Sequence, residues 1–160
     1  MTAIDMEIDA FLADSAESVQ GKIYALGIGW NTVFAPQFPA THPRVALGVT
    51  VHVPYTATNA PHALTVSLVD EDGTKQMLGR APSSTGEPRP VFDLTANFNV
   101  GRPPMLPEGD EQIVAMAMVI DQMSFSRPEM LAWVFEVDGV ELKRLPMRVA
   151  QLAQQPGMLR

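Results

Sequence analysis

The segment from Arg44 to Val53 alternates between apolar and small or polar side chains, and no other feature of the sequence constrains the fold as strongly. Successive side chains of a strand point to opposite faces, so the valines and the leucine share one side of an extended chain. A helix would spread the same residues around its axis. The segment is therefore predicted to be a strand whose valine side packs on a core. Its other side, which faces solvent or a neighbouring element, carries Ala46, Gly48, Thr50 and His52.

Similar short runs recur along the chain, and turn-forming residues separate them, whereas long helical periodicity is absent. The pair Asp138-Gly139 lies between two alternating runs and favours a hairpin turn, because both central residues of that turn need a positive φ. Strands are predicted at residues 6–14, 22–30, 44–53, 62–70, 92–100, 112–120, 131–137 and 140–149. Loops rich in proline or polar residues are predicted around Pro36, Pro39 and Pro43, at residues 79–90 and at residues 101–109.

About eight or nine short strands at this spacing are typical of a β-sandwich or a β-barrel, and we favour an antiparallel sandwich. Two facing sheets would enclose the valine strand, the strand of Phe92 and Phe98, and the strand of Trp133. We predict a single all-β domain over residues 1–150, followed by a tail at residues 151–160. A chain of 160 residues can bury a core of sufficient size without a metal or a disulfide.

The composition excludes several classes of partner. The net charge is −7 and lysine occurs at only three positions, so binding to nucleic acid or to an anionic membrane through phosphate groups is not expected. The absence of cysteine excludes a disulfide framework, a thiolate metal site and a cysteine nucleophile. Residues 1–17 carry acids where a signal peptide needs a basic segment, and no apolar run reaches the roughly 18 residues of a membrane span. A cytoplasmic location is therefore expected.

Three segments resemble an uncharacterised bacterial family, chiefly actinobacterial, known only as a domain of unknown function with an Ig-like or C2-like sandwich. The first segment carries most of the resemblance, because Gly21-Lys22 leads there into an apolar strand that ends in Gly-x-Trp. The resemblance implies a fold, and it implies no active site. The segments are FLADSAESVQGKIYALGIGW (11–30), LTVSLVDEDGT (64–74) and LAWVFEVDGVELKRLPMRV (131–149).

Neither a catalytic set nor a metal-ligand set stands out. The pattern Gly-x-Ser-x-Gly is absent, and no spacing selects a pair of carboxylates for glycoside hydrolysis. His42 falls in a proline-rich loop, His52 has an outward position on its strand and His62 an inward one, so a shared metal is not expected. Asp70 and Asp72 form a turn that resembles only part of a calcium loop, and turn formation is favoured over calcium binding. We predict no catalytic residue, no metal ligand and no cofactor.

Residues 112–120 are apolar on both faces, as expected of a central strand or of a strand that a partner covers. Methionine is favoured at adaptable interfaces, which makes this strand a candidate contact surface. Alternatively, the methionines form the second face of a central strand and pack in the core. The candidate interface residues are Met116, Met118 and Ile120, which share one parity, and Met123 just beyond them.

Trp30, Phe34 and Phe38 lead into the first proline-rich loop. These rings either cap the sandwich or form a platform for a sugar or another small molecule. Two function hypotheses follow. The first is a non-catalytic interaction or assembly module that binds a protein partner or a second copy of itself. The alternative is a sandwich that binds a small molecule or carbohydrate through its proline-rich loops, and an enzyme ranks third.

If Trp133 lies in the core, Trp133→Ala is expected to lower the free energy of unfolding by about 3–5 kcal/mol, because the lost ring leaves a cavity. Urea denaturation of the wild type and the variant measures this difference. A loss below about 1 kcal/mol would place Trp133 at the surface and contradict the assignment of its strand.

Overall fold

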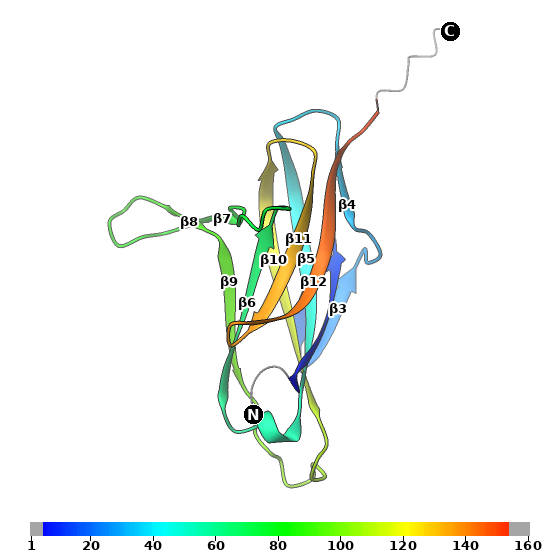
Figure 1. Cartoon of the computed structure of the whole chain (residues 1–160), viewed down its shortest axis with the longest axis vertical. Helices are drawn as coiled ribbons and strands as arrows, with labels where there is room; N and C mark the ends of the chain where they lie inside the picture. Colours follow the sequence, from blue (N-terminus) through cyan, green and yellow to red (C-terminus); the bar gives the residue numbers. More distant parts are fainter. Residues whose placement is uncertain (1–4, 154–160) are drawn as a thin grey trace.

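The computed structural model of the chain describes residues 5–153, and strands dominate it, as the alternating patterns predict (Figure 1). One short 3-10 helix, η2 (Tyr55–Ala57), follows the fifth strand among the described residues. The strands are β1 (Glu7–Ala13), β2 (Ser15–Val19), β3 (Lys22–Leu26), β4 (Thr32–Ala35), β5 (Ala40–Val53), β6 (Pro61–Val69), β7 (Gly79–Ala81), β8 (Arg89–Val91), β9 (Asp93–Asn99), β10 (Gln112–Phe125), β11 (Glu129–Val137) and β12 (Val140–Gln151).

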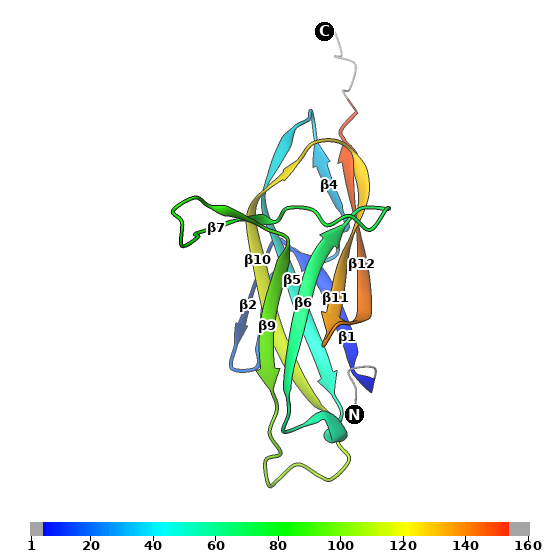
Figure 2. The same ribbon diagram turned by 60° about the vertical axis from the view of Figure 1, so that its left-hand side comes forward.

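Two main sheets form two layers around one core (Figures 1 and 2). The first contains three strands in the order β1-β5-β10, and the second contains five in the order β4-β12-β11-β6-β9. The valine side of β5 faces the core as predicted, and its residues from Val45 to Val53 are fully buried. Opposite them lie buried side chains of the five-stranded sheet, including Leu64, Val66, Trp133 and Phe135. The prediction of an all-β fold is therefore confirmed, while the Ig-like or C2-like type stays a prediction.

Trp133, the largest fully buried side chain, makes a polar contact inside the core. Trp133 is fully buried, and its indole N–H points to the sulfur of Met147 with a distance of 3.5 Å between Nε1 and Sδ. A buried indole usually finds such a partner, because an unpaired donor in an apolar core is costly. Met147 lies on β12, so this contact links two neighbouring strands of the five-stranded sheet.

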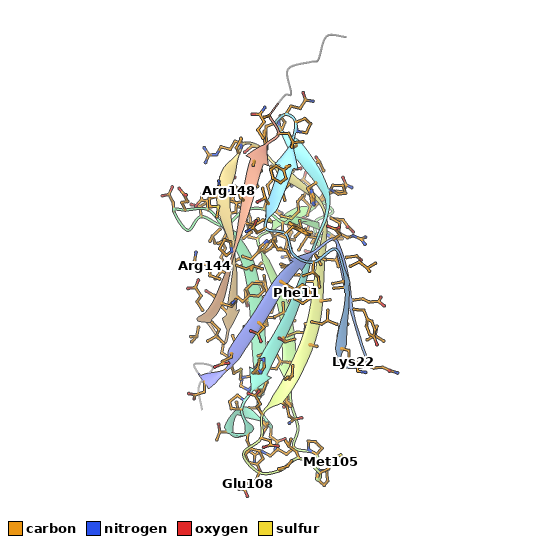
Figure 3. The ribbon with its side chains drawn as sticks, turned by 90° about the vertical axis from the view of Figure 1, so that its right-hand side faces the viewer. Phe11, Lys22, Met105, Glu108, Arg144 and Arg148 are labelled. Carbon is orange, nitrogen blue, oxygen red and sulfur yellow. The ribbon has the colours of Figure 1, made fainter. Side chains whose placement is uncertain are left out.

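The outer face of β5 is covered by the chain itself. Gly48 lies directly opposite Phe11 of β1, whose ring occupies the space where a side chain at Gly48 would stand. The hairpin of β2 and β3 then folds over the same face, where Ala13, Ala16 and Ala46 form a second buried cluster. The small residues of β5 were expected to face either solvent or a neighbouring element, and the hairpin is that element. Figure 3 shows Phe11 on β1 and Lys22 at the turn of the hairpin.

Two predicted loops contain strands. The segment around Pro36 includes β4 and the first residues of β5, and β4 pairs with β12 in parallel, the exception to an otherwise antiparallel arrangement. Pro43 is tolerated within β5, because β1 pairs only with residues 46–52 and leaves this part of the strand at an edge. Residues 79–90 form a narrow arm in which β7 pairs with β8, and it projects from the two layers (Figures 1 and 2).

Two further predictions need correction. Phe92 was expected in the core beside Phe98, but Phe92 is 40% exposed and Phe98 is only partly buried, because β9 lies at the edge of its sheet. The predicted tail begins within structure, since β12 continues to Gln151 and the N–H of Leu152 donates to the carbonyl of Ala35 over 2.8 Å. The remainder of the tail, residues 154–160, lies outside the described residues.

The predicted turn at Asp138-Gly139 is confirmed. Both residues have positive φ values, 50° and 83°, and they connect β11 to β12.

In the part of the chain that the structure describes, no helix combines the length and the apolar character needed to cross a membrane.

Gly48→Ala is expected to lower the free energy of unfolding by about 1–3 kcal/mol, because its Cβ would collide with the ring of Phe11. In a Phe11→Ala background the same change should cost much less, since the obstructing ring is gone, and a double-mutant cycle by urea denaturation measures the coupling. Gly79→Ala is the matched control, because a Cβ at Gly79 meets nothing within 4 Å. Equal penalties in both backgrounds would show that the ring does not restrict this position.

Candidate functional site

One side of the two-layered structure is open. β10 ends the three-stranded sheet and β9 ends the five-stranded sheet, and within the described residues neither has a strand partner on its outer edge. Both strands line one cleft with a volume of about 530 Å³. Its lining is mostly small or apolar and includes Leu94, Thr95, Ala96, Ala115, Met116 and Met118. In Figure 2, β9 passes in front of β10.

The inner face of β10 is incompletely covered at this cleft. Met116 pairs with Val49 and Met118 pairs with Leu47 across the ladder to β5. The two β5 residues are fully buried, whereas both methionines are only partly buried although they pack against the same core. Burial thus decreases from the central strand to the edge strand on the same face. The opposite sheet leaves the methionines partly open to the cleft.

The predicted methionine interface is therefore divided in the structure. Met116 and Met118 line the cleft, but Ile120 and Met123 are buried in the core with exposures of 6% and 2%. The expectation of a central strand at residues 112–120 is wrong, because β10 pairs with β5 alone among the described strands. Its second apolar face has a different cause. The β2–β3 hairpin packs there, and the hydroxyl of Ser18 donates to the carbonyl of Ala115 over 2.9 Å.

The cleft is almost free of charge. Asp93 is its one charged lining residue among those described, and its carboxylate lies 2.6 Å from Nζ of Lys75. The lining therefore offers apolar surface and strand backbone, which are suited to binding. Of its polar side chains, Ser18 donates its hydroxyl to the carbonyl of Ala115, and Asp93 is paired with Lys75.

The three aromatic residues proposed as a ligand platform differ in exposure. Trp30 and Phe38 are partly buried and pack against the core, whereas Phe34 is 60% exposed on β4. The Trp30 ring centroid lies 6.1 Å from that of His42. Two of the three rings therefore cap the core, and Phe34 alone is offered to solvent.

His62 is held inside the molecule by two acceptors. Its Nδ1 lies 2.7 Å from a carboxylate oxygen of Asp138 and its Nε2 lies 2.8 Å from the carbonyl of Ala57. Only the imidazolium can donate both hydrogen bonds. Burial lowers the pKa of His62, but the bonds to Asp138 and Ala57 outweigh it and the pKa lies above its ordinary value. The side chain is 6% exposed.

His52 lies between two carboxylates on the outer face of its sheet. Nδ1 is 2.9 Å from Glu111 and Nε2 is 3.0 Å from Asp9. The hydrogen bond to Glu111 raises the pKa of His52 most, the bond to Asp9 adds to it, and burial opposes both. These contacts join β1, β5 and the residue before β10. His52 and His62 thus form structural ion pairs with residues far apart in sequence, and the sequence patterns did not predict these pairs.

The acidic residues at positions 70–72 form a turn in which the Asp70 side chain binds the backbone. Oδ1 of Asp70 accepts the N–H groups of Asp72 and Thr74 over 3.0 and 2.9 Å, as aspartate does in turns. Across residues 5–153, no group of three or more histidine or acidic side chains has an arrangement suited to a metal ion. The functional candidate is therefore the cleft between β9 and β10.

Comparison with known proteins identifies the family. The chain belongs to a family of unknown function, DUF6941, whose profile matches residues 8–150. This confirms the resemblance to a domain of unknown function, whereas its bacterial origin stays a prediction. No curated protein matches the chain in sequence.

Two solved structures show distant likeness. The alkylpurine DNA glycosylase AlkC of Pseudomonas fluorescens, bound to DNA containing an abasic site analogue, is 11% identical with a TM-score of 0.41, and the match covers 91% of this chain and 30% of that chain. A family 123 glycoside hydrolase from Clostridium perfringens is 11% identical with a TM-score of 0.30, and the match covers 90% of this chain and 27% of that chain. The chain thus spans less than a third of either protein, and neither likeness carries an argument about function.

The free energy of unfolding is expected to fall as the pH rises from 6 to 9. The folded-state pKa values of His52 and His62 lie above the ordinary value of 6.5. Their contribution is therefore complete below about pH 6.5 and is lost as the pH rises through the folded-state pKa values. Urea denaturation at several pH values measures the decline.

The variants His52→Gln and His62→Gln should each reduce the decline, and the double variant should reduce it most. The slope with pH is the quantity to compare, because replacing a buried His62 also changes the absolute stability. Equal slopes in the wild type and the double variant would contradict the assignment of both histidines as imidazolium groups.

Proposed function

We propose that this domain is a non-catalytic interaction module whose protein partner docks in the cleft between β9 and β10. The proposal is supported chiefly by the half-buried Met116 and Met118, which lie on an inward face that the opposite sheet does not fully cover. Completing that cover would remove apolar area from water, which favours association. Methionine adapts its shape to different partners.

The edges of the sheets support the same location. Natural proteins protect free strand edges with charges, proline or short strands. β1 carries Glu7 and Asp9, and β4 has only four residues and is followed by Pro36. Residues 94–99 of β9 and residues 112–120 of β10 contain no charge and no proline. Charges lie only outside these stretches, at Asp93 and Asp121, so the parts of the two edges that flank the cleft carry little protection, which is expected of edges that a partner covers.

Site-specific photo-crosslinking in the native host tests the proposal. With p-benzoylphenylalanine at position 118, the protein is expected to form an adduct with a defined protein, and Met116→Glu should abolish it because a charge would be buried in an apolar contact. The same photo-reactive residue at position 34, which is 60% exposed on β4, is the control.

The mass of the adduct identifies the partner. A mass of twice the 17.4 kDa chain indicates that the module assembles with its own copies, and another mass indicates a different protein. If position 118 gives no more adduct than position 34, or if Met116→Glu leaves the adduct unchanged, the cleft is not the docking site.

A further inference from the structure

The edge of β9 is a complete, regular strand edge. Its seven residues pair with β6 from Pro61 to Ser67, and its side chains alternate between partly buried and exposed positions. Leu94, Ala96 and Phe98 take the inward positions. A strand of this kind presents N–H and C=O groups along its outer edge at the spacing that another extended chain can match. The edge of β10 is less available, because Ser18 already binds the carbonyl of Ala115.

The cleft also places apolar surface where a further strand would lie. Facing sheets pack about 10 Å apart and neighbouring strands about 4.8 Å apart. A strand added to the free edge of β9 would therefore lie about one strand spacing from β9 and border the cleft that β9 and β10 line together. Met116 and Met118 lie on the inner face of β10 and line the same cleft as Leu94 and Ala96. Side chains on one face of the added strand would contact these methionines.

The charges of the cleft define the chemistry of that strand. Asp93 is the only charged lining residue described, and Lys75 already neutralises it. A charge on the inward face of a bound segment would lose its water and find no free counter-charge, which is unfavourable. The complementary segment is therefore uncharged and apolar at alternate positions, while its outward positions face solvent and are unrestricted.

We propose that the cleft accepts an extended segment of a partner protein, apolar at every second residue, which adds to the free edge of β9 as a sixth strand and covers Met116 and Met118. This inference rests on the proposed function and specifies the partner. Backbone hydrogen bonds to β9 supply affinity, and the methionine floor selects the side chains.

A phage-displayed library of random segments seven residues long, the length of β9, tests the proposal. Binders are selected on the purified full chain, and their complexes are mapped by NMR shift changes. Selected segments should show apolar residues at alternate positions and should shift the amides of β9 and the methyl groups of Met116 and Met118. Failure to select binders, or binders that map away from the cleft, would overturn the proposal.

Methylation of the peptide backbone separates strand addition from other binding at the same cleft. Synthetic copies of a selected peptide carry N-methyl groups on alternate residues, in one register or in the other. The register that faces β9 should lose at least about tenfold in affinity, because its donors are removed, while the other register should stay within about threefold. Equal effects of both registers would overturn strand addition and would leave the crosslinking result on the cleft intact.

Variants of the protein provide the matching control. Met118→Glu should weaken peptide binding at least about tenfold, whereas Met105→Glu should not change it, because Met105 is 87% exposed in the connection between β9 and β10 (Figure 3). Light scattering of the free chain tests whether a second copy of the chain, and not a partner segment, occupies the cleft. A stable dimer whose interface excludes the peptide would identify a second copy in the cleft and contradict the partner segment.

Discussion

The structure depends on the burial of both faces of β5. Its inner face, from Val45 to Val53, packs against the five-stranded sheet and supplies much of the core. Its outer face is made of small residues, so Phe11 and the β2–β3 hairpin can approach the backbone closely. Gly48 is the point where this approach is tightest, because the ring of Phe11 fills the volume of the missing side chain. A central strand covered on both sides leaves its two neighbours as the edges of a narrow sheet.

The open side of the molecule follows from how the chain uses residues 15–26. These residues could have extended the three-stranded sheet, but they pair with each other and cover its outer face. Three strands therefore face five, and β10 remains an edge strand with a partly covered inner face. The cleft between β9 and β10 lies at this edge, while the hairpin covers the outer faces of β5 and β10. The lining of the cleft is apolar and nearly uncharged.

Period-two patterns predicted the principal strands because they report burial, which is a property of each face. They could not report hydrogen-bonded neighbours. This is why residues 112–120 were interpreted either as a central strand or as a strand that a partner covers, whereas β10 is an edge strand whose outer face the hairpin covers only around Ala117. For the same reason, the sequence could not distinguish the partly buried Met116 and Met118 from the buried Ile120 and Met123. The opposite sheet determines which residues of β10 are buried. The hairpin turn at Asp138-Gly139 was predictable because its φ requirement is local.

Contacts across the sequence could not be predicted by any local pattern. The ion pair of His62 with Asp138 spans 76 residues, and that of His52 with Glu111 spans 59. Both lie near the same end of the two layers, where η2 and the β11–β12 turn meet the start of β6. Isolated histidines on alternating strands gave no sign of their partners, because the acids that bind them belong to other elements.

These ion pairs also bear on the cleft, because residues 100–111 connect β9 directly to β10 across its lower end. Arg102 binds Thr58 and the carbonyl of Tyr55, and its guanidinium lies 4.1 Å from the centre of the Tyr55 ring. At the other end of the connection, Glu111 binds His52. The connection is therefore anchored on both sides to elements that the core holds in place. The two ends of the connection are thus held by side-chain contacts to η2 and to β5, which lie outside the cleft.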